Sequence, residues 1–246
     1  MSKKYSVYRR PLDDIKIENR FIPKGLVNRT GNMQVPKYIV IHETSLGLGK
    51  TPKSKDMDNY EQLLYQYAER NMPVGYHYCV SDSEVWQFIP DDERTSQTGK
   101  GTLGNLMGIG IERLVNEVTD RNKSIHIQAK LSATLMIKWD IPLENVLTHR
   151  AIQHASNYEQ KKDCPSRMLA GQYGGTTQFY AEVLRCIQYG WIFEDHLSED
   201  KLAYYKNLLN DSNEKNIYMC LFTDSILTHG EKFHDIQIND SGHFKR

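Results

Sequence analysis

The stretch Tyr38-Ile39-Val40-Ile41-His42-Glu43-Thr44 indicates where the centre of the fold lies. Its run of Ile and Val favours a strand that is covered on both faces and therefore lies inside a sheet rather than at its edge. His42 stands where this rigid strand passes into a loop, and a side chain held in that way is suited to bind a metal. A histidine at a strand end is also commonly a hydrogen-bonded structural residue, so its partners elsewhere in the chain must decide between the two interpretations.

Further elements alternate along the chain after this strand. Helical spacing of apolar residues predicts helices at residues 56–71 and 127–139, and a third that is capped by Thr176 or Thr177 and ends at Gly190. Alternating aromatic and β-branched residues predict a hairpin at 75–90 and strands at 107–112 and 145–148. The polar segment that contains Gly99, Gly101 and Gly104 is expected to be a long loop, and the segment from His149 to Cys164 is also expected to be a polar loop. This order predicts an α/β fold, in which a central mixed β-sheet is flanked by helices on both faces.

Composition divides the chain into three parts. Residues 1–36 are interrupted by prolines and glycines and are expected to form an irregular N-terminal arm packed on the main domain. Residues 37–190 hold the expected α/β domain. Residues 191–246 form a C-terminal extension that is too short for a large core of its own, with an expected helix at 202–209 and strand at 217–222. The extension is either an appendage docked on the main domain or a small binding module.

The balance of charge excludes some classes of partner. The 246 residues contain 31 Lys and Arg and 31 Asp and Glu, so no overall positive field recruits nucleic acid or an anionic membrane. No apolar run approaches the length that a bilayer needs, and no apolar region of a secretory signal follows the basic N-terminus. We therefore expect neither a nucleic-acid partner nor insertion into a membrane. We expect the protein to be synthesised in a cytoplasm. The oligomeric state is left open.

Three potential metal ligands lie at the ends of expected elements, namely His42, His149 and Cys164. Two imidazoles and one thiolate suit zinc, and three protein ligands leave a fourth position for water, which is typical of catalytic rather than structural sites. Glu112 ends another expected strand and adds a carboxylate. Taken alone, that carboxylate is most simply a surface residue. The pattern predicts a metal site that is assembled from separate strands and loops.

Five segments resemble, in the same order, the zinc-dependent N-acetylmuramoyl-L-alanine amidases of the type 2 family, which are related in fold to peptidoglycan recognition proteins. The matching segments are Tyr38–Thr44, Val74–Tyr78 with Ile89-Pro90, Ile109–Glu112, Ile141–Val146 leading to Thr148-His149, and Cys164–Leu169. Each motif is weak alone, but five in family order form a specific signal over roughly residues 20–188. The arm before the first strand also resembles phage endolysin members. Nothing similar is recognised in residues 191–246.

The resemblance implies roles for individual residues. The implied Zn²⁺ ligands are His42, His149 and Cys164. Glu112 would act as general base on the attacking water and later pass the proton on. Lys162 would stabilise the oxyanion, although a solvated charge in a charged loop is an equally good interpretation. Tyr76 stands where some members place a tyrosine near the scissile carbonyl.

Three departures from the family pattern concern the site. Ser96-Gln97-Thr98-Gly99 stands where many relatives carry Trp-His-Ala-Gly. Glu43 replaces the commoner Asn, and it is expected either to tune the metal or to face solvent. The segment between His149 and Cys164 is longer than in the compact phage relatives, and it contains His154, a competing candidate ligand.

The resemblance implies a hydrolase that cleaves the amide bond between N-acetylmuramic acid and L-alanine in bacterial peptidoglycan, as a phage-type endolysin does. Such an enzyme is expected to be made in the host cytoplasm without a signal peptide and to act on the cell wall after release, with residues 191–246 as a candidate wall-binding segment. Two alternatives are a non-catalytic peptidoglycan-binding module and a cytosolic wall-recycling amidase. Cys164 disfavours both, because non-catalytic relatives tend to lack this ligand and recycling amidases often carry Asp there.

Overall fold

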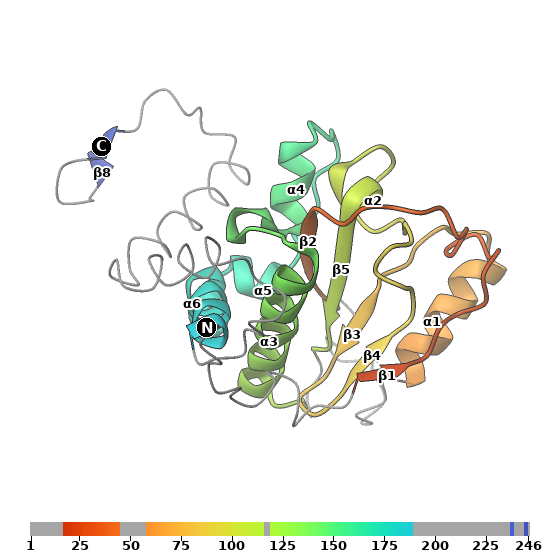
Figure 1. Cartoon of the computed structure of the whole chain (residues 1–246), viewed down its shortest axis with the longest axis horizontal. Coiled ribbons are helices and arrows are strands. Elements are labelled where there is room, and N and C mark those ends of the chain that lie inside the picture. The colour runs from red at the N-terminus through yellow and green to blue at the C-terminus, as the bar shows by residue number, and fades with distance from the viewer. Residues whose placement is uncertain (1–16, 45–57, 116–118, 189–236, 239–243, 246) are drawn as a thin grey trace, which may run out of the picture.

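The computed structural model describes residues 17–44, 58–115, 119–188, 237–238 and 244–245. Among these residues a six-stranded sheet in the order β1-β4-β3-β5-β2-β6 lies between helices (Figure 1). The strands are β1 Ile17–Asn19, β2 Tyr38–Glu43, β3 Tyr78–Val80, β4 Val85–Gln87, β5 Gly108–Arg113 and β6 Val146–Thr148. β3 and β4 pair antiparallel and the other neighbours pair parallel. The expected mixed sheet is confirmed.

Helices cover both faces of this sheet, as the sequence predicts. The helices are α1 Asp58–Glu69, α2 Leu103–Met107, α3 Arg121–Trp139, α4 His149–Ala155, α5 Ser166–Leu169 and α6 Gly175–Gln188, and short 3-10 turns lie at Leu143–Asn145 and Gln172–Gly174. α3 and α6 pack together on one side of the sheet, and α1 lies on the other side (Figure 1). Within the described residues, every helix is too short or too polar to cross a bilayer.

The strand β2 lies between β5 and β6, which confirms its expected central position. Its side chains alternate between the two faces of the sheet. Ile39 and Ile41 join the core formed with α3 and α6. Val40 packs instead with Leu147 and with Ala151 of α4. All of these side chains are buried, so both faces of β2 are covered and its residues are held firmly in place.

Two helices begin at positions that differ from the sequence prediction. α3 begins at Arg121 rather than at residue 127, because the Asp120 side chain accepts hydrogen bonds from the first free N–H groups of the helix. α6 begins at Gly175, so neither Thr176 nor Thr177 is its N-cap. In both cases the first turn lies outside the apolar stripe that was used to locate the helix.

Two segments that were expected to be loops contain short helices. The predicted polar loop after His149 begins with α4, whose N-cap Thr148 accepts a hydrogen bond from the N–H of Ala151. The glycine-containing loop before β5 contains α2, with Thr102 as its N-cap. Helices of this length do not repeat their apolar residues often enough to show a helical period. Both expectations of continuous loop are therefore wrong.

The arm also contains regular structure where an irregular course was expected. Its residues Ile17–Asn19 form β1, which pairs parallel with β4 at the edge of the sheet, and Ile22 is buried. Near the C-terminus, β7 Gln237–Ile238 and β8 Phe244–Lys245 pair antiparallel. The helix predicted at 202–209 and the strand predicted at 217–222 lie outside the described residues. The division into 1–36, 37–190 and 191–246 stays a prediction.

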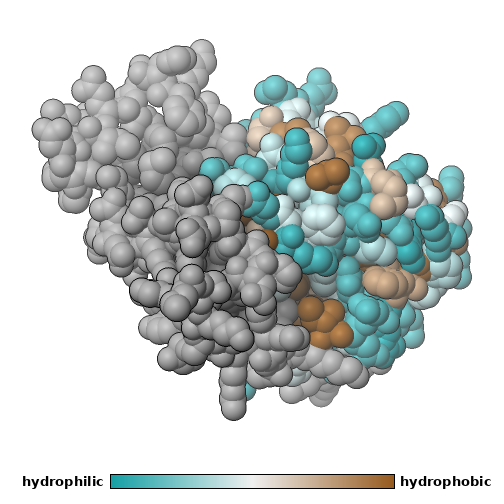
Figure 2. Space-filling model, viewed as in Figure 1, coloured by the Kyte–Doolittle hydropathy of each residue, from teal (hydrophilic) through white to brown (hydrophobic). Residues whose placement is uncertain are grey.

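The described surface carries its apolar residues in small separate groups. Figure 2 shows them as isolated spots on a mainly hydrophilic face. The exposed large apolar side chains include Met33 and Val35 of the arm segment and Leu106 of α2. Single exposed apolar residues are ordinary on a globular protein.

Candidate metal centre and active site

The register of the central strands places the predicted site residues in one row. In the parallel pair β2–β5, His42 lies opposite Glu112, and in β2–β6, Ile41 lies opposite Thr148. His149 directly follows Thr148, so it emerges beside His42. The carboxyl ends of parallel strands meet at one edge of a sheet, which is where ligands bind in open α/β folds. The backbone alone therefore brings residues from three distant parts of the chain together.

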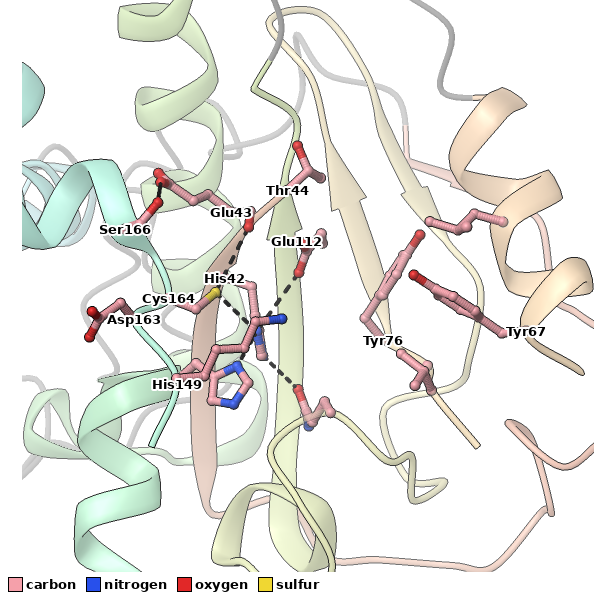
Figure 3. A pocket seen from close by; sticks show the side chains of 15 residues that line it. His42, Glu43, Thr44, Tyr67, Tyr76, Glu112, His149, Asp163, Cys164 and Ser166 are labelled. Carbon is pink, nitrogen blue, oxygen red and sulfur yellow. Dashed lines mark hydrogen bonds and ion pairs between the residues drawn. The ribbon is translucent and has the colours of Figure 1, made fainter. Parts of the chain in front are cut away.

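The three predicted ligands converge at this edge. The Nδ1 atoms of His42 and His149 are 3.2 Å apart, and the Sγ of Cys164 lies 3.7 Å from Nδ1 of His42 (Figure 3). All three ligand atoms lie within 4.8 Å of one another, and all three residues are buried. Among the described residues, these three have ligand atoms close enough to one another to hold a metal ion. His154, the competing candidate ligand, does not belong to this group.

Burial keeps both imidazoles of this group neutral. It lowers the pKa of His42 well below its ordinary value, and the neighbouring His149 adds to the effect. Burial also lowers the pKa of His149 to about 3, with a further contribution from Lys162. Burial and the nearby Glu112 raise the pKa of the Cys164 thiol. Neutral imidazoles can bind a metal directly, whereas the thiol must first lose its proton to the solvent.

Glu112 stands beside the three ligands with an unusual affinity for protons. Its Oε2 lies 3.8 Å from Nδ1 of His42. Burial raises its pKa to about 7, and the positive charge of Lys162 acts in the opposite direction. A carboxyl group with this pKa is present in both forms near neutral pH, so it can accept a proton in one step and return it in another.

These residues line one pocket of about 160 Å³, together with the other two predicted catalytic residues. Lys162 lines the pocket and is exposed. Tyr76 is buried and lies on the side opposite the ligands (Figure 3). Tyr67 of α1 lines the same side as Tyr76, and it is not among the site residues predicted from the sequence. Its place in an apolar helical stripe indicated a packing residue, and nothing else in the sequence distinguishes it.

Glu43 neither faces solvent nor points at the ligands. It is buried, and its Oε2 accepts a hydrogen bond of 2.8 Å from the guanidinium of Arg113, which is completely buried. Its Oε1 accepts hydrogen bonds from the hydroxyl of Ser166 at 3.1 Å and from the backbone N–H of Arg167 at 2.5 Å. Alternation along β2 explains this direction, since neighbouring side chains of a strand point to opposite faces. Glu43 thereby attaches the segment just after Cys164 to the sheet.

Two buried glutamines that are not among the residues predicted from the sequence hold other parts of the site. The amide of Gln128 donates hydrogen bonds to the carbonyls of His42 and Ile111, so it joins β2 to β5 next to the ligands. Gln153 accepts from the N–H of Lys162 at 2.8 Å and donates to the carbonyl of Thr98 at 2.7 Å. Gln153 follows His149 by one helical turn, so the two lie on the same side of α4. This relation can be recognised only once the helix α4 is known.

Comparison with known proteins identifies the family. Residues 32–167 match the family model described as N-acetylmuramoyl-L-alanine amidase, and this span contains His42, Glu112, His149 and Cys164. The chain belongs to this amidase family.

Relatives and solved structures agree with the family. The chain is 31% identical over 174 residues to N-acetylmuramoyl-L-alanine amidase XlyA of Bacillus subtilis (strain 168). The matched region covers 68% of this chain and 54% of XlyA. It is also 31% identical over 157 residues to N-acetylmuramoyl-L-alanine amidase CwlH of the same organism. This second matched region covers 63% of this chain and 57% of CwlH. The chain thus spans little more than half the length of these curated relatives.

The catalytic domain of XlyA superposes with a TM-score of 0.54 at 30% identity, over 68% of this chain and 99% of that domain. A mutant endolysin from Bacillus subtilis superposes with a TM-score of 0.57 at 29% identity, over 69% of this chain and 99% of the other. The fold of the chain is that of these amidase-family domains.

Proposed function

We propose that this chain is a zinc-dependent hydrolase that cleaves the amide bond between N-acetylmuramic acid and L-alanine in bacterial peptidoglycan, and that it serves as a phage-type endolysin. The observation that carries the proposal is the convergence of His42, His149 and Cys164 beside Glu112 in one pocket. Membership of the amidase family supports the choice of substrate. Zinc and peptidoglycan are thus the proposed cofactor and partner.

The donor set fits zinc in chemistry and spacing. With Zn–N bonds of about 2.0 Å and Zn–S bonds of about 2.3 Å, a tetrahedral site holds neighbouring ligand atoms about 3.3 to 3.6 Å apart. The N–N separation of 3.2 Å and the S–N separation of 3.7 Å are close to this range. His42, His149 and Cys164 would hold the ion. When bound, zinc lowers the pKa of a water molecule toward about 7 and polarises the scissile carbonyl.

The residues around the ligands supply the remaining chemistry. Glu112 would take a proton from the attacking water and deliver it to the nitrogen of the leaving L-alanine, and a pKa of about 7 suits both transfers. The ammonium group of Lys162 would stabilise the negative charge that develops on the carbonyl oxygen. Tyr76 would contact the substrate near the scissile carbonyl from the opposite side of the pocket.

The test is mass spectrometry of the fragments that the zinc-loaded protein releases from purified peptidoglycan. We expect new L-alanine amino termini without new reducing sugars. Glu112→Gln should keep one zinc per chain and lose about 10²- to 10⁴-fold in turnover, because the proton acceptor is gone. The exposed Glu144→Gln variant is the matched control and should keep wild-type turnover. New reducing ends instead of amino termini would indicate a glycosidase.

The same experiment separates the amidase from a binding module. A non-catalytic module would sediment with peptidoglycan and release nothing. Wild-type turnover in Glu112→Gln would remove this residue from the mechanism, and protein without stoichiometric zinc would refute the metalloenzyme. The endolysin role, with synthesis in the host cytoplasm and action on the wall after release, predicts that cytoplasmic expression alone leaves cells intact. Co-expression with a pore-forming holin should then lyse them.

A further inference from the structure

We propose that Gln97 fixes the tautomer of His42 and so selects Nδ1 as the atom that His42 presents to the metal. This inference rests on the proposed zinc site and deepens it. Gln97 lines the pocket, and the family resemblance places it where many relatives carry a histidine. Its role is that of a positioning residue, since it would act on the metal only through His42.

The surroundings of Gln97 determine how its amide is oriented. Its Nε2 lies 2.9 Å from the carbonyl oxygen of Gly104 and 2.8 Å from that of Gly108. Carbonyl oxygens can only accept hydrogen bonds, so the NH₂ group, which carries two hydrogens, must face them. The amide oxygen is thereby turned toward His42, where Oε1 lies 3.2 Å from Nε2. The opposite orientation would place an acceptor against two acceptors.

The orientation of the amide decides which imidazole nitrogen carries the proton. The Oε1 of Gln97 can only accept, so Nε2 of His42 must donate. A neutral imidazole has one N–H, and Nδ1 is therefore left with a free lone pair. That atom lies 3.2 Å from Nδ1 of His149 and 3.7 Å from Sγ of Cys164. Hydrogen bonds to the remote nitrogen of a ligating histidine commonly set its tautomer and direction in metal sites.

The chain around Gln97 holds the side chain in this position. The backbone N–H groups of Gln97 and Thr98 both donate to Oδ1 of Asn105, at 2.8 and 2.7 Å. Gly110 of β5 leaves the space that the amide fills, since a Cβ atom there would stand 1.9 Å from Oε1 of Gln97. This close approach accounts for a glycine in a buried strand. The amide is therefore in place before any metal binds.

The direct test is NMR measurement of the imidazole nitrogen shifts of His42 in the zinc-free protein. We expect the hydrogen on Nε2 in the wild type. In Gln97→Met, which has a similar volume and only a weak sulfur acceptor, we expect a mixture of both tautomers. Zinc affinity, measured by competition with a chromophoric chelator, should fall about 10- to 100-fold in this variant, the usual loss for a partner of a ligating residue.

Two variants separate the tautomer from general loosening of the loop. Asn105→Ala removes the acceptor for the backbone of Gln97 but keeps the amide contacts with the carbonyls of Gly104 and Gly108. It should therefore lower the melting temperature, keep the hydrogen on Nε2 of His42 and reduce the zinc affinity less than Gln97→Met does. Gln97→Glu keeps an acceptor facing His42 and loses the donors to Gly104 and Gly108. It should be less stable than the wild type and bind zinc within about threefold of it.

A hydrogen on Nδ1 of wild-type His42, unchanged zinc affinity in Gln97→Met, or an equal loss of affinity in Asn105→Ala would each overturn the proposal. The tautomer is measured without zinc or substrate. Failure of the proposed amidase activity would therefore appear separately, as a zinc-loaded wild-type protein that releases no fragments from peptidoglycan.

Discussion

The two sides of the metal-ligand group are built in different ways. On the strand side, His42 and Glu112 are placed by the hydrogen-bond ladder between β2 and β5. On the loop side, Cys164 follows a segment without regular structure. Gln153 holds that segment at Lys162, and Glu43 holds the segment just after Cys164, at Ser166 and Arg167. A ladder holds each residue through many backbone bonds at once, whereas a loop depends on a few individual contacts. Single substitutions should therefore disturb the loop side more than the strand side.

The largest effect is expected from Glu43→Ala. It removes the charge partner of the fully buried Arg113, and breaking a buried pair from one side costs about 3–5 kcal/mol of unfolding free energy. It also removes the acceptor for Ser166 and Arg167, so Cys164 should be placed less well and zinc affinity should fall. Urea unfolding of the zinc-free protein and zinc competition measure the two effects.

A double variant separates these two roles of Glu43. Glu43→Leu with Arg113→Met replaces the buried pair by apolar side chains and should recover most of the stability. It should not recover the zinc affinity, because the segment after Cys164 still lacks its acceptor. Full recovery of both would show that Glu43 acts on stability alone.

A smaller effect is expected from Gln153→Ala. It leaves the N–H of Lys162 and the carbonyl of Thr98 without their buried partner, at a cost of about 1–3 kcal/mol. Turnover should fall because Lys162 is less well positioned, while zinc affinity should change less than in Glu43→Ala. Arg150→Ala on the same helix removes an ion pair with exposed Asp163 and should cost about 0–1 kcal/mol. Equal effects of the two variants would contradict the assigned role of Gln153.

The smallest effect is expected at His77, whose buried side chain supports strand β5, and it concerns the dependence of stability on pH. The N–H of Gly110 in β5 donates to Nδ1 of His77, and the other ring nitrogen contacts the carbonyl of Glu93. Burial lowers the pKa of His77, and nearby carboxylates, Asp91 among them, oppose this only in part. Below the usual histidine pKa of about 6.5, His77 binds a proton in the unfolded chain but not in the native state. The contribution of His77 to the free energy of unfolding is therefore fully present above this pH and is lost as the pH falls.

His77→Asn keeps an acceptor near Gly110 and cannot titrate. Between pH 7 and pH 5, the wild type should lose stability more steeply than this variant, by up to about 1.4 kcal/mol per pH unit. Unfolding curves at several pH values give the free energy of unfolding of both proteins. The contributions of the other titrating groups cancel in the difference between the two. Parallel pH profiles would show that His77 does not titrate on unfolding.

Much of the strand side was predictable from the sequence. The Ile-Val-Ile run of β2 and the glycine-rich run of β5 are unambiguous buried strands, and residues at their ends must share one edge of a parallel sheet. His42 and His149 were predicted because they end expected strands, whereas Glu112 was given a role only by the family resemblance. Cys164 was selected by its chemistry and by family resemblance, since no periodic pattern surrounds it. The loop side was less predictable because α4 is too short to show a helical period.

The sequence by itself determined the α/β class, the central strand and the set of residues able to bind a metal, because these depend on local composition and on the ends of buried strands. The tertiary structure alone decided how those residues are supported. The buried contact of Glu43 with Arg113, the amide contacts of Gln97 and the bridge made by Gln153 join segments that are far apart in the chain. Such contacts depend on the packing of several elements at once, and no local pattern of residues encodes them.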